Sequence, residues 1–121
     1  MWVINMSDSA ILIKSKAFAV RIIKLYQHLC SHSYEFILSK QLLRSGTSIG
    51  ANVRESVYAY SKKEFAAKMS IALKETNESA YWLELLYETG YLTKSQFDSI
   101  YADNEELLKL LTAIVKTSRK Q

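Results

Sequence analysis

The chain has 121 residues, a length that suits one domain with a real hydrophobic core and is too short for two ordinary domains. Its 49% hydrophobic, 23% charged and 12% aromatic residues exclude a disordered or fibrous chain, and its formal charge of +4 permits contact with nucleic acid or an acidic protein without requiring it. Proline is absent and only three glycines occur, which favours long helices over strands and tight turns, so the composition predicts an all-α domain.

Four segments with helical periodicity follow one another, at about residues 8–31, 35–58, 61–89 and 93–117. In the first segment, Ser7 or Asp8 is expected to cap the helix N-terminus. The apolar residues of this segment share one face, which is typical of a helix packed against a core. That face is formed by Ile11, Phe18, Ile22, Leu25 and Leu29.

The second segment carries a polar stripe beside its apolar stripe. At about 100° per residue, its five polar side chains fall within an arc of about 80°. They are Gln41, Arg44, Ser48, Asn52 and Glu55. Polar groups in this position are expected to be at least partly buried, and a buried guanidinium or carboxylate needs a partner. The third segment offers Glu75, Glu78 and Trp82 on one face.

The third and fourth segments each open with a capping box. Ser61 with Glu64 begins one helix, and Thr93 with Gln96 begins the other. Gly90 suits the left-handed position after the third helix. Because the connections are short, consecutive helices must be antiparallel neighbours. The sequence therefore predicts a single domain, residues 1–121, folded as an up-down-up-down antiparallel four-helix bundle.

Arg44 and its acidic partners allow two interpretations. Carboxylates with shifted pKa values perform acid and base chemistry, so Glu75 and Glu78 could belong to a catalytic site. We favour a structural ion-pair network that fixes helix register, with further hydrogen bonds from Ser48 and Asn52, because no nucleophile or set of metal ligands converges with it. We expect no catalytic residue, no enzymatic activity and no small-molecule substrate.

A run of small residues in the second segment allows another helix to approach closely, but it lacks the preceding strand and the lysine of a phosphate-binding loop. The run consists of Ser45, Gly46, Ser48, Gly50 and Ala51.

His28 and His32 have the spacing of half a metal site, but a third ligand is missing, so we interpret them as surface histidines. We expect no metal and no cofactor.

Basic and aromatic side chains gather in two places, where they could hold phosphates and stack bases. Around the second connection they are Arg54, Tyr58, Tyr60, Lys62 and Lys63, and a basic strip on the first segment adds Lys14, Lys16, Arg21 and Lys24. The alternative is a solvated charged face, with the tyrosines packed against the end of the bundle. Residues 1–63 hold nine Lys/Arg against three Asp/Glu, whereas residues 64–121 hold seven against nine, so the first half is the basic one.

The second and third segments have more apolar surface than one stripe can use, which predicts self-association. The additional residues are Leu43, Thr47, Ala51 and Tyr58 in the second segment and Ile71, Trp82 and Leu86 in the third.

Cys30 is the only cysteine, which favours a reducing, cytoplasmic setting. The first ten residues lack the pattern of a signal peptide, and the apolar stretch 10–13 is too short for a bilayer, so neither export nor membrane insertion is expected.

The stretches KQLLRSGTSIGANVRES and KEFAAKMSIALKETNESAYWLELLYETGYL resemble the bacterial four-helix-bundle proteins called 23S ribosomal RNA intervening-sequence proteins. The resemblance covers about residues 10–115. The residues that carry it are Gln41, Arg44, Ser48, Ile49, Asn52, Glu55, Phe65, Ala72, Glu75, Glu78, Trp82 and Leu83. This family is similar in turn to the accessory variability protein of diversity-generating retroelements, a basic pentameric barrel of four-helix bundles that binds the reverse transcriptase and nucleic acid.

The resemblance implies a non-enzymatic bundle that assembles into a homo-oligomer, with a pentamer as the expected form. The chain departs from the family pattern at Glu55-Ser56, where Glu-Gly is common, and at Gly46, where a bulkier residue is common. We expect a binding or scaffold protein whose partner is RNA or a nucleic-acid-processing protein. The alternative is a purely structural protein–protein assembly module without nucleic-acid contact.

Overall fold

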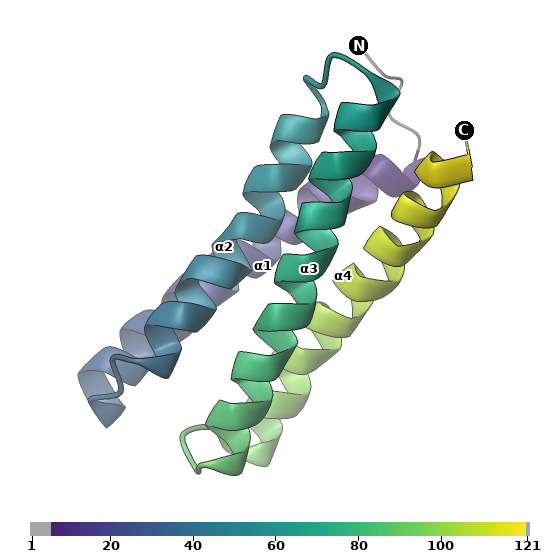
Figure 1. Ribbon diagram of the computed structural model, residues 1–121. Coiled ribbons are helices and arrows are strands. Elements are labelled where there is room, and N and C mark those ends of the chain that lie inside the picture. Colours follow the sequence, from purple (N-terminus) through teal and green to yellow (C-terminus); the bar gives the residue numbers. More distant parts are fainter. Residues whose placement is uncertain (1–5, 121) are drawn as a thin grey trace.

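The computed structural model describes residues 6–120, which form an antiparallel bundle of four helices (Figure 1). The helices are α1 (Met6–Ser33), α2 (Leu38–Ser56), α3 (Lys62–Glu88) and α4 (Lys94–Lys120). The described residues include no strand. The predicted all-α, up-down-up-down four-helix bundle is confirmed. Positions 1–5 and 121 of the predicted domain lie outside the described residues.

Helix α2 is shorter at both ends than the predicted segment 35–58. Glu35 lies in the α1–α2 connection, where its carboxylate accepts hydrogen bonds from the backbone N–H groups of Ile37, Leu38 and Ser39 at 3.2, 3.1 and 2.7 Å. These bonds satisfy N–H groups that have no partner within a helix, so Glu35 takes the role of a cap and α2 begins only at Leu38. The described part of α1 begins at Met6, and the side chains of Ser7 and Asp8, for which a cap was predicted, lie outside the described part of the structure.

The predicted capping residues of α3 and α4 are confirmed, although α1 and α4 extend to Ser33 and Lys120, past the predicted ends at about 31 and 117. Ser61 Oγ accepts a hydrogen bond from the backbone N–H of Glu64 at 3.1 Å and caps α3. Thr93 and Gln96 bond each other reciprocally at 3.1 and 2.9 Å, which is the complete capping box predicted before α4. Gly90 has a φ of +87°, a conformation that glycine adopts without strain and that ends α3 as expected.

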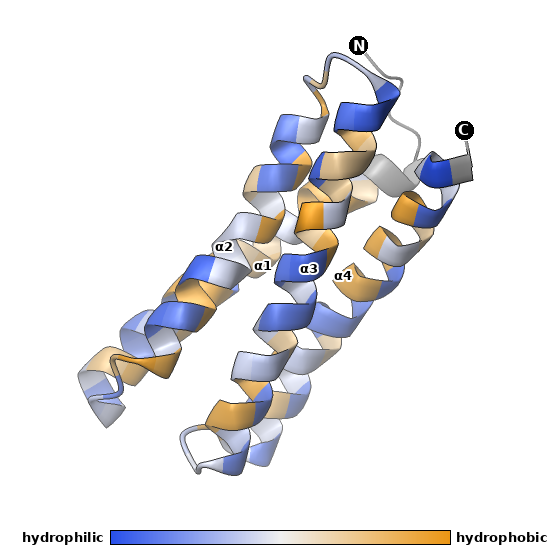
Figure 2. Cartoon of the chain, viewed as in Figure 1, coloured by the Kyte–Doolittle hydropathy of each residue, from blue (hydrophilic) through white to orange (hydrophobic). Residues whose placement is uncertain are grey.

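The bundle core is formed by the inward faces of all four helices, and Figure 2 shows the alternation of apolar and polar residues along each helix that this packing requires. Each buried aliphatic or aromatic side chain contributes about 1.5–3 kcal/mol relative to an exposed one. The predicted inner face of α1 is confirmed, except that Leu25 lies half-buried at the edge of the core. The largest fully buried side chains are Ile11, Phe18, Ile22, Leu29, Leu42, Ile49, Val53, Met69, Leu83, Leu86, Leu107 and Leu111.

Helices α1 and α2 approach each other closely where α2 has glycines. A Cβ atom added at Gly46 would lie 2.9 Å from Cγ1 of Ile22, and one added at Gly50 would lie 3.3 Å from the carbonyl oxygen of Ser15. The predicted role of the small-residue run is therefore confirmed at these two positions. The glycine at position 46 leaves room for the buried Ile22 side chain of α1.

The four helices form a closed ring of contacts in which each helix packs against its chain neighbours, and α1 and α4 share the least extensive contact. The α1–α2 pair diverges from the α3–α4 pair toward the end that holds the first and third connections (Figure 1). A pocket of about 330 Å³ lies between α1 and α4 near this end, lined by Arg21, Leu25, Leu92, Ser95, Gln96, Ser99 and Ile100. Over residues 6–120, no helix has the length and apolar character needed to cross a membrane.

Candidate functional site

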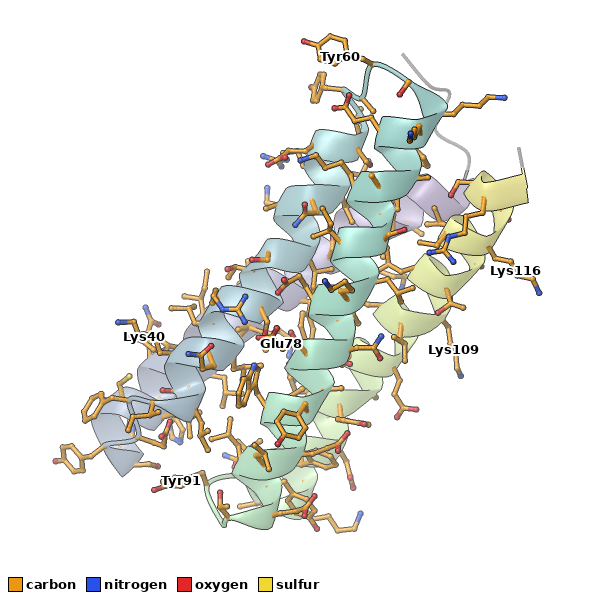
Figure 3. The ribbon with its side chains drawn as sticks, in the orientation of Figure 1. Lys40, Tyr60, Glu78, Tyr91, Lys109 and Lys116 are labelled. Carbon is orange, nitrogen blue, oxygen red and sulfur yellow. The ribbon has the colours of Figure 1, made fainter. Side chains whose placement is uncertain are left out.

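The predicted partners of Arg44 are confirmed. Its guanidinium lies 3.3 Å from Oε2 of Glu75 and also forms an ion pair with Glu78. The indole N–H of Trp82 donates to Oε2 of Glu78 at 3.0 Å, and the Arg44 Nε donates weakly to Gln41 at 3.5 Å. Figure 3 shows Glu78 between α2 and α3, where these side chains connect the two helices.

The network is only partly buried: Glu75, Glu78, Ser48 and Asn52 are partly buried as predicted, but Arg44, at the centre of the network, is exposed. The Arg44 side chain is 50% exposed, and the side chains of Glu75 and Glu78 are 18% and 35% exposed. Gln41 and Glu55 are exposed as well. The stripe follows the outer edge of the α2–α3 contact, where water still reaches one side of each charged group. An ion pair in such a position contributes about 0–1 kcal/mol, so the network orients two helices more than it stabilises them.

The prediction that Ser48 and Asn52 add hydrogen bonds to the charged groups of the Arg44 network is wrong, and Glu55 also lies outside this network. Ser48 Oγ donates to the Arg44 carbonyl at 2.7 Å and Asn52 Nδ2 donates to the Ser48 carbonyl at 2.8 Å, so both side chains bond the backbone of their own helix. Glu55 pairs instead with Lys68 at 2.7 Å, and this hydrogen bond and charge raise the pKa of Lys68.

The buried polar link between α2 and α3 lies elsewhere. Ser45 and Ser79 share a hydrogen bond of 2.8 Å between their Oγ atoms, and both residues are fully buried. The sequence analysis identifies Ser45 only as a small residue and does not identify Ser79. A serine on the inner face of the third segment, opposite the small-residue run of the second, is the signal that points to Ser79. This bond replaces the buried charged contact that the sequence predicted.

The carboxylates of the Arg44 network and the two histidines of α1 form no metal site among the described residues. Both carboxylates near Arg44 are occupied by ion pairs, and no group of three or more His, Cys, Asp or Glu side chains in this part of the chain could hold a metal ion. His28 and His32 are exposed, and their rings stack on each other with centroids 4.3 Å apart. Ser31 Oγ bonds His32 Nδ1 at 2.9 Å, which is an ordinary contact at a helix end.

Half of the predicted basic strip on α1 is engaged within the molecule. Lys14 pairs with Glu106 at 3.1 Å, and Arg21 pairs with Asp103 at 2.5 Å and also donates to Ser99. These contacts join α1 to α4 across the least extensive helix contact of the bundle. Lys16 and Lys24 are exposed and have no ion-pair partner among the described residues. The strip is therefore weaker as a candidate nucleic-acid surface than the sequence indicated.

The second candidate surface lies at the end of the bundle that holds the α2–α3 connection, where Arg54, Tyr58, Tyr60, Lys62 and Lys63 are all exposed. Tyr58 is 74% exposed and Tyr60 is 95% exposed. The alternative interpretation is therefore wrong in placing these tyrosines against the bundle, while its solvated charged face agrees with the exposure of the cations. Figure 3 shows Tyr60 at the tip of this end, extending away from the helices.

The local sequence holds this connection in place. The backbone N–H of Tyr58 donates to the Glu55 carbonyl at 3.1 Å, and that of Ala59 donates to the Ser56 carbonyl at 3.2 Å. Ala59 is buried, and the N–H of Tyr60 donates to the Glu64 carboxylate at 3.2 Å. The connection is thus fixed to both helices, and its two tyrosine rings are left in solvent.

Two further cations at this end were missed. The C-terminus of α4 lies at the same end of the bundle as the α2–α3 connection (Figure 1). It brings Lys116 and Arg119, both exposed, to this end. In any up-down bundle the second connection and the C-terminus share an end, so this proximity could have been inferred. We call the surface formed by Arg54, Tyr58, Tyr60, Lys62, Lys63, Lys116 and Arg119 the basic end.

The opposite end of α3 and α4 is acidic. Glu84 and Glu88 lie near the C-terminus of α3, and Asp98 and Glu105 lie in the first half of α4. The Tyr101 hydroxyl donates to Glu84 at 2.6 Å, and this bond, with burial, raises the pKa of Tyr101 to about 12. Along α3 and α4, positive charges therefore gather toward one end and negative charges toward the other, with Lys94 as an exception that pairs with Asp98.

Comparison with known proteins agrees with this architecture. Residues 7–113 match the family described as 23S rRNA-intervening sequence protein. The chain belongs to this family. A crystal structure of a protein of unknown function from the S23 ribosomal protein family of Bacteroides thetaiotaomicron is similar to it, with 53% sequence identity and a TM-score of 0.90. The similarity covers 92% of this chain and 99% of the other. No curated protein matches the chain.

The membership in this intervening-sequence family confirms the resemblance on which part of the sequence analysis depended. The family and the similar structure point to no enzyme class. The residues that carried the resemblance include both the Arg44 network and the buried contacts of α2 and α3, so the family pattern in this chain describes how these two helices pack.

Proposed function

We propose that the protein is a non-enzymatic, oligomeric scaffold of the cytoplasm that binds RNA through phosphate contacts at its basic end. One observation carries this proposal. Arg54, Lys63, Lys116 and Arg119 are exposed at one end of the bundle and have no ion-pair partner among residues 6–120. A cluster of unpaired cations attracts polyanions, and displacement of counterions from phosphates supplies the binding free energy.

The direction of α3 supports the same proposal. Lys62 and Lys63 lie in its first turn, the positive end of the helix dipole, and Glu88 lies in its last turn, the negative end. Each such placement costs the helix about 0.3–1 kcal/mol relative to the reverse arrangement. The positive end of a helix also attracts anions, so lysines in this position strengthen a phosphate-binding surface at the expense of helix stability.

The proposal of self-association rests on exposed apolar side chains. Ile13, Val20 and Ile23 lie exposed along α1, and Tyr34, Phe36 and Ile37 lie exposed in the α1–α2 connection. Exposed apolar surface of this kind is typical of a contact between subunits. The expected pentamer would have a mass of about five times the 13.9 kDa of one chain.

RNA binding is tested by filter binding of a structured RNA at about 50 mM and about 200 mM salt. We expect micromolar or tighter binding at the lower salt concentration and a loss of affinity on the order of tenfold or more at the higher one, because several phosphate contacts are replaced by cations. The absence of salt-sensitive binding at micromolar protein would contradict the proposal. If an oligomer forms under the same conditions without RNA binding, the protein is a pure assembly module.

Self-association is tested by light scattering across a range of protein concentrations. A mass that is a multiple of 13.9 kDa is expected at high concentration. A mass that stays near 13.9 kDa would contradict the oligomer.

A further inference from the structure

The two tyrosines of the basic end have no structural task within the chain. Neither ring takes part in a hydrogen bond or ring contact among the described residues. Both rings are largely exposed, although exposing an aromatic ring to water costs free energy. The exposed Tyr81 differs in this respect, since its ring packs against that of Trp82 with centroids 5.3 Å apart. Tyr58 and Tyr60 are therefore available for an external partner.

From these two rings we infer that the basic end recognises unpaired nucleotides, by stacking bases on Tyr58 and Tyr60, in preference to RNA duplex. This inference rests on the proposed function, because it specifies the form of RNA that the same surface binds. The tyrosines lie two residues apart, so their Cα atoms are separated by no more than about 7 Å, a distance that neighbouring nucleotides can match.

The chemistry of RNA explains why exposed rings select unpaired segments. In an A-form duplex the base faces are covered by their stacking neighbours, and its major groove is too deep and narrow for side chains. In a single strand each base can expose a π face, on which an aromatic side chain stacks with little dependence on base identity. Cations alone bind the phosphates of both forms, so only the rings provide the preference.

The surroundings of the rings suit a nucleic acid better than an apolar protein segment. Arg54 precedes Tyr58 by four residues, and Lys62 and Lys63 follow Tyr60 after Ser61. The backbone between the tyrosines is held by the buried Ala59 and by the hydrogen bonds to Glu55, Ser56 and Glu64. Because the backbone that carries the rings is held, only the side-chain torsions lose freedom when a base binds, which limits the entropic cost of stacking.

The test compares three probes by fluorescence anisotropy at one salt concentration. They are an oligouridine strand of about 20 nucleotides, an RNA duplex of about the same length, and a strand of abasic spacers with the same number of phosphates. We expect wild-type protein to bind the oligouridine about tenfold or more tightly than the abasic strand, because only the bases differ. We expect the oligouridine also to be preferred over the duplex.

Variants separate stacking from other roles of the tyrosines. Tyr58→Ser with Tyr60→Ser should reduce oligouridine affinity by about tenfold or more and leave binding to the abasic strand unchanged. Tyr58→Phe with Tyr60→Phe should retain the wild-type affinity, because the ring remains and only the hydroxyl is lost. Tyr91→Ala is the matched control, since Tyr91 is also exposed but lies at the opposite end of the bundle (Figure 3).

The outcomes distinguish the two levels of the proposal. If wild-type protein binds the oligouridine, the duplex and the abasic strand equally and with steep salt dependence, the preference for unpaired bases is overturned while RNA binding stands. If the serine variants bind the oligouridine as wild type does, stacking on these rings is likewise overturned. If no probe binds in a salt-dependent manner, the proposed function and this inference fall together.

Discussion

The α1–α2 and α2–α3 connections both expose large aromatic side chains, yet they differ in what surrounds those side chains. In the first connection, Tyr34 and Ile37 are each 76% exposed and Phe36 lies between them, with few cations nearby. In the second, Tyr58 and Tyr60 are flanked by Arg54, Lys62 and Lys63. Exposure alone therefore does not identify a partner. The neighbouring charges favour a protein surface for the first connection and RNA for the second.

The two connections are also held by different means. The first depends on the buried Glu35, whose carboxylate binds three backbone N–H groups and whose carbonyl accepts a bond from Ser39 Oγ at 2.7 Å. The second depends on backbone hydrogen bonds and on the buried methyl group of Ala59, with one bond to the Glu64 carboxylate. Acid should therefore weaken the first connection more than the second.

The largest expected effect is on stability, from replacing Glu35. Glu35→Ala leaves three N–H groups at the start of α2 without their acceptor, and we expect the free energy of unfolding to fall by about 3 kcal/mol. The measurement is urea unfolding at neutral pH, with Glu105→Ala as the control because Glu105 is exposed and has no hydrogen bond or ion pair among the described residues. A loss no larger than that of the control would show that the connection is held by other contacts.

Glu35 also predicts how stability depends on pH. Burial raises the pKa of this carboxyl, but the backbone hydrogen bonds from Ser39, Leu38 and Ile37 lower it more, so its pKa in the folded protein lies below 4.5. The stabilisation is present in full above the unfolded-state pKa of 4.5 and is lost as the pH falls through the folded-state pKa. Below that pH, wild type and Glu35→Gln should become closer in stability. A difference that persists there would contradict the role of the charge.

The second expected effect is on RNA binding, from reversing charges at the basic end. Arg54→Glu with Lys63→Glu removes two phosphate contacts and adds two repulsive charges, so affinity for RNA should fall by about 50-fold at about 0.1 M salt. Lys40→Glu with Lys109→Glu changes the net charge equally but away from the basic end (Figure 3). If the two double variants lose the same affinity, binding follows net charge and the basic end is not the site.

The number of helices, their cores and most of their ends could be predicted from periodicity and capping residues, because these depend on neighbours along the chain. The role of Glu35 could not, since a glutamate near an apolar run reads equally well as the first turn of a helix. The exposure of Arg44 could not either, because a small rotation of α2 decides whether its polar stripe faces the core or the edge of the contact. The basic end could be predicted only by combining the residue types with the antiparallel arrangement of the helices, because its residues come from the α2–α3 connection and from the C-terminus of α4.

The third effect concerns self-association through the first connection. Phe36→Asp with Ile37→Asp places two charges on its exposed apolar side chains, and we expect the midpoint of association to rise by about tenfold in protein concentration. The measurement is sedimentation or light scattering over a dilution series, with Ala102→Asp at an exposed position of α4 as a comparison. An unchanged midpoint would assign the subunit contact to another surface, such as the exposed apolar residues of α1.

The smallest expected effect comes from Arg44, although its network is the most extensive set of charged contacts between two helices. Arg44→Met removes both ion pairs but keeps the aliphatic part of the side chain, and because the guanidinium is half exposed we expect a loss of about 1 kcal/mol or less. Lys94→Met, which removes the more exposed pair with Asp98, should cost still less. RNA binding should not change, because the network lies outside the basic end. A loss above about 2 kcal/mol would mean that Glu75 and Glu78 depend on Arg44 as buried charges do. In that case the α2–α3 contact, and not the connections, would contribute most to specifying this bundle.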